Sequence, residues 1–195
     1  KSIQSYSIVH RNEVLSSSDN AKNIPIIVHN VNHHLENKTS EISNIIIDGE
    51  FRLLNPEDII IGNVLANNLR VNVGDTIELS NYNNIYKQEF FKISGIFDSG
   101  IYEYNQRFVY GSDLALTSTD SYTYIKLKLS DPLDAVNTSK DLFTEHGIIS
   151  SNWTETHNAL FQAIGNEKRV MFIILMLIIA ITSFNIISSL SLLVL

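Results

Sequence analysis

The hydrophobic and polar positions divide the chain at Arg169. No charged residue follows between residues 170 and 195, whereas charged and polar residues recur throughout the part before it. A helix over the uncharged run spans roughly 39 Å, more than the ~30 Å hydrocarbon core of a bilayer. The pattern therefore predicts a transmembrane helix, and a buried core helix is the alternative.

Polar residues inside this run fall mainly on one side of the predicted helix. Thr182, Asn185 and Ser189 follow i, i+3, i+7 spacing and so share a face. Small and polar residues on one face indicate contact with other membrane helices, although Ser and Thr also bond to their own backbone. An amide in hydrocarbon is costly without a partner, so Asn185 favours a helix or cavity contact.

The orientation of the membrane helix stays open at this point. Lys168 and Arg169 precede it, and counting them alone would place the first 169 residues in the cytoplasm. Long domains are translocated largely regardless of charge, so this count does not decide the matter.

The part before residue 170 alternates between short extended runs and turns. A short helix is expected at residues 64–69, a loop or short helix at 36–43, and turns at 55–58 and 73–75. Apolar runs and alternations predict strands at residues 5–9, 25–31, 45–47, 76–79, 89–97 and 106–110.

Residues 122–151 form a clearer unit. Residues 122–129 alternate, with Tyr122, Tyr124, Lys126 and Lys128 on one face and Thr123, Ile125, Leu127 and Leu129 on the other. A helix is expected from Asp131 to His146, buried at Leu133, Val136, Leu142 and Phe143, and then a strand at 148–151. This β-α-β half needs a complement, which residues 1–10 and elements upstream of the chain are expected to supply.

A second helix is expected to begin after Asn152. Glu155 lies three residues further on, which is the spacing of a capping box. No Pro separates this helix from the membrane run, so we hypothesise one continuous shaft that transmits movement between the soluble part and the membrane.

Composition excludes several classes of protein. The chain of 195 residues has 14 Lys+Arg, 21 Asp+Glu and a net charge of −7, which argues against a nucleic-acid partner. It has no Cys, and His29 and His33 come together only if their strand-like segment were helical. G-x-S-x-G, P-loop and G-x-G-x-x-G patterns are absent from the sequence. We therefore expect no catalytic residue, no cofactor and no metal.

Three stretches resemble a known family of permeases. IIIGNVLANNLRVNVGDTIELS (residues 59–80) resembles a signature of periplasmic domains in MacB/FtsX-type ABC transporter permeases. FFKISGIFDSGIYEYNQRFVY (90–110) resembles the strand pair that follows it in lipoprotein-releasing permeases. NWTETHNALFQAIGNEKRVMFIILMLIIAITSFNIISSL (152–190) is similar to the same permeases entering their second membrane helix, and this is the most specific of the three.

The resemblance implies a LolC/LolE-type permease subunit of the bacterial inner membrane, with its soluble domain in the periplasm. Such a subunit is non-catalytic and extracts lipoproteins for a periplasmic carrier, while a separate ATPase subunit hydrolyses ATP. The implied partners are therefore the ATPase, a second permease subunit, the lipoprotein, possibly the carrier, and the membrane. A MacB- or FtsX-type permease that transmits movement for efflux or cell division is the alternative.

The resemblance also implies an α+β periplasmic domain followed by a transmembrane helix, in an internal fragment of a longer protein. The expected parts are a porter-like α+β subdomain (1–12 and 121–152), a β-rich inserted subdomain (13–120), a stalk helix (153–169) and the transmembrane helix (170–195). A single-span membrane anchor bearing a binding or enzymatic domain is a third reading, which no catalytic constellation supports.

The candidate functional residues lie in two places. Those expected to contact acyl chains, neighbouring helices or simply bulk lipid are Met171, Phe172, Leu175, Met176, Ile179, Thr182, Asn185 and Ser189. A carrier-docking hairpin of the family maps to Leu116, Thr117, Ser118, Thr119, Asp120 and Ser121. That segment is short and has no Pro, Gly or Arg, so a docking and a non-docking subunit both stay open.

Overall fold

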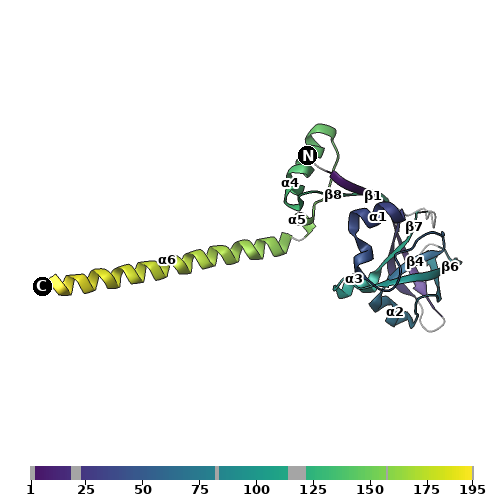
Figure 1. The fold of residues 1–195 in the computed structure, drawn as a ribbon, viewed down its shortest axis with the longest axis horizontal. Coiled ribbons are helices and arrows are strands. Elements are labelled where there is room, and N and C mark those ends of the chain that lie inside the picture. Colours follow the sequence, from purple (N-terminus) through teal and green to yellow (C-terminus); the bar gives the residue numbers. More distant parts are fainter. Residues whose placement is uncertain (1–2, 19–22, 82–83, 114–121, 157, 195) are drawn as a thin grey trace. The chain divides into compact units, whose positions relative to one another are not determined.

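The extended runs of the first part of the chain form one sheet. The computed structural model describes residues 3–18, 23–81, 84–113, 122–156 and 158–194. The strands are β1 Ile3–Ser17, β2 Ile24–Val31, β3 Ile46–Gly49, β4 Asp58–Gly62, β5 Thr76–Asn81, β6 Asn84–Phe97, β7 Phe108–Ser112 and β8 Tyr122–Leu129 (Figure 1).

Helices connect these strands and make up the end of the chain. They are α1 His33–Ser40, α2 Asn63–Leu69, α3 Tyr102–Arg107, α4 Ala135–His146, α5 Trp153–Thr156 and α6 Asn158–Val194, with 3-10 helices at Ile42–Ile45 and Pro132–Asp134. The chain separates into two compact units, Lys1–Ser130 and Asp131–Leu195. All the strands belong to the first unit, and α4, α5 and α6 belong to the second. The finer subdomain boundaries expected from the sequence stay a prediction.

Strand pairing in the first unit closes on itself. Hydrogen-bonded neighbours run in the order β2, β7, β4, β6, β5 and β1, and β1 also pairs with β2 to complete a ring of six strands. β2–β7 and β4–β6 are parallel, and the other neighbours in the ring are antiparallel. β3 joins the outside of β6, and β8 pairs with β1.

β4 is covered on both faces, because it is apolar on both faces. Its residues are all buried, as expected of a strand with a continuous rather than an alternating apolar run. Ile59 and Ile61 pack in one hydrophobic cluster with residues such as Leu65 and Phe91. Ile60 points into a second cluster that contains Phe97.

Gly62 lets the segment after β4 approach α3 closely. A Cβ atom at this position would lie 2.1 Å from the backbone oxygen of Asn105, which no side chain can tolerate. Only glycine therefore fits in the IIIGN turn that ends β4 and begins α2.

The first half of β1 and all of β8 form a two-stranded extension of the ring. Their antiparallel register runs from Ile3↔Leu129 to Arg11↔Tyr122. The expected strand at 122–129 is confirmed, and so is the expectation that residues 1–10 supply its partner. We call residues 3–8 of β1 together with β8 the ribbon.

Three sequence-based expectations are wrong. Residues 148–151 form no strand, because the described part of the second unit contains no strand with which they would pair. Leu133 and Phe143 were expected to be buried, yet they are 77% and 61% exposed, because α4 meets no sheet within its own unit. The strand expected at 106–110 begins at Phe108, because residues 106 and 107 form the end of α3 and the Phe108 N–H still bonds to Tyr104 O of that helix.

The cap predicted at Asn152 is confirmed, with one difference. Its Oδ1 accepts hydrogen bonds from the backbone N–H of Thr154 (3.1 Å) and of Glu155 (3.2 Å). Glu155 accepts a bond from the side-chain amide of Asn152 at 2.8 Å, whereas a capping box would use the backbone N–H.

Removing this cap is expected to loosen the start of α5. Asn152→Ala deletes the side-chain acceptor of the Thr154 and Glu155 N–H groups, which costs about 1 kcal/mol. The Glu155 N–H keeps a second bond to the backbone oxygen of Asn152 at 3.1 Å. Hydrogen exchange of a peptide spanning residues 153–156, in the chain held in detergent micelles, measures the loss. Asn137→Ala on the exposed side of α4 is the control. An equal change at 153–156 in both variants would contradict the capping role.

Candidate functional site

α6 joins the charged segment and the apolar run in one helix (Figure 1). Its stretch Gln162–Leu193 is long and apolar enough to cross a membrane, and its most apolar window is not buried in the protein. It is the one such helix among the described residues. The continuous helix expected from residue 153 is confirmed from Asn158 onward, whereas Trp153–Thr156 forms the short helix α5 and residue 157 lies outside the described residues.

The eight residues expected to contact lipid or helices all lie on α6. Large apolar members such as Leu175 and Ile179 are more than half exposed. At about 100° per residue, six of the eight fall within a sector of about 120°, whereas Phe172 lies about 20° and Met176 about 60° outside it. The six are Met171, Leu175, Ile179, Thr182, Asn185 and Ser189. We call this sector the contact face; the ligand of the face stays a prediction.

Polar groups along α6 differ in how they are satisfied. The Thr182 hydroxyl donates to the backbone oxygens of Ile178 and Ile179, each at 2.9 Å, so it is satisfied within its own helix. Ser191 bonds to Ile187 O in the same way. Asn185 and Ser189 make no side-chain hydrogen bond within the described residues. The contact face therefore carries one amide that hydrocarbon would leave unsatisfied.

The predicted carrier-docking segment, Leu116 to Ser121, lies outside the described residues.

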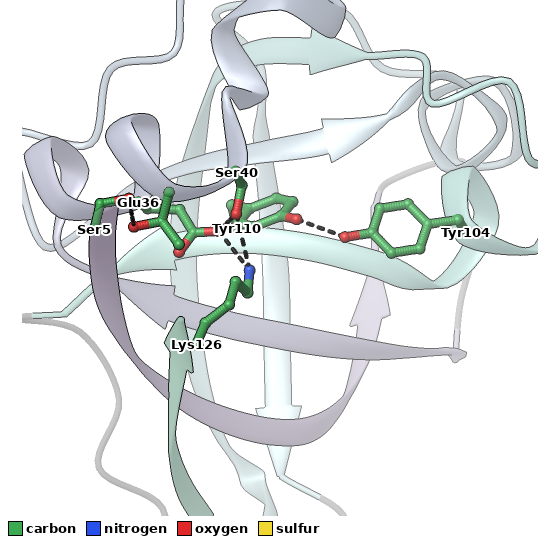
Figure 2. Close-up of polar contacts among 7 residues, drawn as sticks. Ser5, Glu36, Ser40, Tyr104, Tyr110 and Lys126 are labelled. Atoms are coloured by element: carbon green, nitrogen blue, oxygen red, sulfur yellow. Dashed lines mark hydrogen bonds and ion pairs between the residues drawn. The ribbon is translucent and has the colours of Figure 1, made fainter. Parts of the chain in front are cut away.

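A buried polar cluster lies between α1 and the ribbon, and sequence reasoning missed it. Figure 2 shows Glu36 and Ser40 on α1 meeting Lys126 from β8. Lys126 Nζ lies 2.6 Å from Glu36 Oε1 and 3.1 Å from Ser40 Oγ, and Ser40 Oγ donates to Glu36 Oε1 at 2.5 Å. The Glu36 side chain is fully buried, whereas that of Lys126 is 31% exposed.

Opposing effects act on the Glu36 carboxyl. Burial alone raises its pKa, since the charged form loses water. The charge of Lys126 and hydrogen bonds from Lys126 and Ser40 outweigh this effect, and the net pKa is lowered. Glu36 is therefore a carboxylate that is held charged in the protein interior.

His29 on β2 lies near the same cluster, among aromatic rings. Its ring centroid is 5.2 Å from that of Phe108, 5.8 Å from Tyr110 and 6.3 Å from Tyr124. Burial, and then the positive charges of Lys126 and Arg11, lower its pKa to about 4, although Glu36 acts in the opposite direction. His29 is therefore neutral at physiological pH.

The histidines weighed as metal ligands have other surroundings. His33 stacks on Phe51 with ring centroids 5.1 Å apart, and it meets His34 edge-on at 5.0 Å. Across the described ranges, no group of three or more His, Asp or Glu is placed to hold a metal ion.

Tyr104 on α3 and Tyr110 on β7 complete the buried polar region. Their hydroxyls lie 2.5 Å apart, as Figure 2 shows. Burial raises the pKa of Tyr110 well above its ordinary value, so both hydroxyls stay protonated and bond to each other. The sequence signal for the whole region was the pair of lysines on one face of residues 122–129, which needs acidic partners that only the fold identifies.

Comparison with known proteins supports the resemblance noted from the sequence. The chain is 30% identical over 177 residues to the lipoprotein-releasing system transmembrane protein LolC of Neisseria meningitidis serogroup B, covering 80% of this chain and 41% of that protein. It is 25% identical over 190 residues to LolE of Haemophilus influenzae, covering 88% of this chain and 45% of that protein. No family model matches the chain.

The fold is similar to that of a solved periplasmic domain. The crystal structure of the periplasmic region of MacB from Actinobacillus actinomycetemcomitans matches with a TM-score of 0.53 and 14% identity, covering 84% of this chain and 77% of that one. The expected mixed α/β domain of MacB type, followed by a long apolar helix as a candidate membrane span, is therefore confirmed. The chain spans about two fifths of the length of the curated relatives it matches.

Proposed function

We propose that the chain is part of a permease subunit of an ABC transporter, one that extracts lipoproteins from the inner membrane and passes them to a periplasmic carrier. The similarity to LolC and LolE, both named as lipoprotein-releasing system transmembrane proteins, carries this proposal. ATP is hydrolysed by a separate subunit, and a second permease subunit completes the membrane part. The first unit, Lys1–Ser130, which we call the strand-rich unit, lies in the periplasm, and α6 lies in the inner membrane.

The contact face of α6 is the part of the chain that meets the cargo. Met171, Leu175 and Ile179 form the end of the face nearer Asn158. All three side chains are apolar, as acyl chains require, and the flexible Met171 adapts to chains of varied shape. Thr182, Asn185 and Ser189 form its other end, where a neighbouring helix satisfies the amide.

Movement passes along α6 in this account. Asn158–Val194 is helical throughout, so a displacement at one end reaches the other without a flexible linker. The permease acts mechanically: it moves lipid out of the membrane with energy that the ATPase supplies.

Reconstitution of the full-length protein with its ATPase tests the proposal. Proteoliposomes that hold both subunits and an acylated lipoprotein are expected to release the lipoprotein to a soluble carrier when ATP is added. The same lipoprotein without its acyl chains serves as the control for unspecific leakage. ATP hydrolysis without release in an intact complex would contradict lipoprotein extraction.

Asn185→Leu is expected to weaken association with the neighbouring membrane helix. Leu keeps the approximate volume but removes the amide that bonds across the interface, at a cost of about 1 kcal/mol. Energy transfer between labelled permease subunits in liposomes measures the change. Ser191→Ala is the matched control, since its hydroxyl bonds to Ile187 O of its own helix and association should stay unchanged. Equal association in all three proteins would show that Asn185 faces lipid.

A MacB- or FtsX-type permease, which transmits movement for efflux or cell-division control, is the second candidate. The similarity of the fold to the MacB periplasmic region is compatible with this second candidate as well as with the lipoprotein permease. The release experiment separates the two, because only a lipoprotein permease frees an acylated protein from the bilayer. Carrier docking by residues 116–121 is part of the first proposal only, and a probe at Thr119 that crosslinks to the carrier would support it.

A further inference from the structure

The face that α1 turns to the protein is polar. Its buried residues are Glu36 and Thr39, and neither is apolar. A helix normally packs on a sheet through an apolar stripe, so apart from the stack of His33 on Phe51 this helix is held to the protein mainly by polar contacts.

Hydrogen bonds and ion pairs connect α1 to both strands of the ribbon. On the side of β1, Thr39 Oγ1 donates to Ser5 Oγ at 3.2 Å, and Ser5 Oγ donates to Lys38 O at 3.2 Å. On the side of β8, Lys126 pairs with Glu36, and Lys128 pairs with Glu41 just after α1. We call this set of contacts the α1 seam.

The seam differs in kind from the contacts that hold the ring together. The strands of the ring pack against two apolar clusters, one on each face of β4, and residues of these clusters such as Ile59 and Phe97 are fully buried. Water can replace each contact of the seam with a similar one, so opening the whole seam has a small net cost. Opening it in part is costly because Glu36 would stay buried without Lys126. The seam should therefore open and close as one unit.

The seam lies next to the point where the chain passes from the first unit to the second, so its opening can affect how movement passes between them. β8 ends at Leu129, and the second unit with α6 begins at Asp131. Among the described residues of the first unit, β8 pairs with β1, and its Tyr122–Tyr124 end stays with the ring, because Tyr124 packs on the cluster that contains Phe97.

Further along β8, Lys126 and Lys128 contact Glu36 of α1 and Glu41 just after it. A pull along the chain from the second unit therefore enters the first unit at the Leu129 end of β8, and the seam helps to decide whether that end of the ribbon moves with the ring.

We propose that the α1 seam is a releasable latch, which opens as a unit so that the ribbon moves relative to the six-strand ring during each transport cycle. The source of the movement rests on the proposed function. The latch itself follows from the polar contacts between α1, β1 and β8.

A disulfide tests the latch directly, and these 195 residues contribute no Cys of their own that could compete with it. Ser5→Cys with Thr39→Cys places two thiols where the hydroxyl oxygens now lie 3.2 Å apart, close enough to form a disulfide that locks the seam. In the full-length transporter, oxidation is expected to lower ATP-driven lipoprotein release at least tenfold, and reduction is expected to restore it. Full release by the oxidised variant would overturn the latch.

A matched control uses two strands of the ring. Thr76 and Lys92 are directly opposite each other on β5 and β6, and Thr76→Cys with Lys92→Cys joins strands that the proposal keeps together. Oxidation of this variant should leave release unchanged. Equal inhibition by both disulfides would show that any crosslink stops the cycle, which also overturns the latch.

A distance measurement keeps the latch testable if the proposed cargo is wrong. Spin labels at Lys38 on α1 and at exposed Ile125 on β8 report the opening of the seam in the full-length complex with its ATPase. Two distance populations are expected during ATP hydrolysis, and a single one in the oxidised disulfide variant. A single unchanged distance in every state would overturn the latch. Opening without lipoprotein release would count against the proposed function and leave the latch intact.

Discussion

Lys126→Met is expected to lower the free energy of unfolding of the strand-rich unit by about 3 kcal/mol. The substitution keeps the length of the side chain but leaves the carboxylate of Glu36 fully buried without its ion-pair partner. Breaking one half of a buried ion pair costs about 3–5 kcal/mol, and the partial exposure of Lys126 favours the lower end of that range. Hydrogen exchange of β1 and β8 peptides, in the chain held in detergent micelles, measures the loss.

Two control variants separate the ion pair from its surroundings. Glu36→Met together with Lys126→Met removes both charges and is expected to cost far less than Lys126→Met alone. Lys128→Met removes the second lysine, whose partner Glu41 is 59% exposed, so it should change stability far less than Lys126→Met does. A double variant as unstable as the single one would show that packing of the Lys126 stem, and not the charge of Glu36, is what stabilises this region.

Acidification from pH 6.5 to 4 is expected to destabilise the strand-rich unit through His29. Its pKa is about 4 in the folded protein and 6.5 when unfolded, so in this window the unfolded chain binds a proton that the folded chain does not. The contribution of neutral His29 to the free energy of unfolding is therefore fully present above pH 6.5. It is lost as the pH decreases, by up to about 3 kcal/mol at 1.4 kcal/mol per pKa unit. The carboxylate of Glu36, whose pKa is lowered, adds a further loss only as the pH falls below its ordinary value of 4.5.

His29→Phe is expected to flatten this profile. Phe retains an aromatic ring among Phe108, Tyr110 and Tyr124 and has no group to protonate. Opening free energies of β2 and β7, from hydrogen exchange at a series of pH values, should then stay level from pH 7 to about 5. The same change at the exposed His34 is the control and should keep the slope of the natural protein. An unchanged slope in His29→Phe would contradict the role of His29.

Local signals in the sequence predicted several elements well. Strict alternation gave the bounds of β8 at Tyr122–Leu129, and the apolar cluster at residues 64–69 gave α2 at Asn63–Leu69. Each pattern repeats with the period of the element it forms, so neighbouring residues suffice to identify it. The uncharged run in α6 was equally plain, since its length matches a bilayer.

The sequence did not predict which distant segments pair with each other. The parallel pairs β2–β7 and β4–β6 and the closure of the ring by β1–β2 depend on contacts that no local period encodes. The polar sequence of residues 36–43 also left both a loop and a short helix open, and the structure has the helix α1, whose buried face carries Glu36 and Thr39. Glu36 finds its partner Lys126 at a separation of 90 residues, which no local pattern encodes.

The candidate site was likewise predicted only in its local features. The spacing of Thr182, Asn185 and Ser189 placed them on one face of a helix, and α6 keeps that face. Which polar groups are satisfied had to come from the structure, because Thr182 bonds to Ile178 and Ile179 within its own helix.

Site-specific photo-crosslinking in cells tests the central claim, lipoprotein extraction, most directly. Probes at Leu175 and Ile179 lie on the contact face of α6, and a probe at the exposed Leu177 lies on another face as the control. In the full-length protein, Leu175 and Ile179 are expected to crosslink to lipoproteins and Leu177 is not. Absence of lipoprotein crosslinks at both positions, in an assembled complex with a working ATPase, would contradict extraction and favour a permease that only transmits movement.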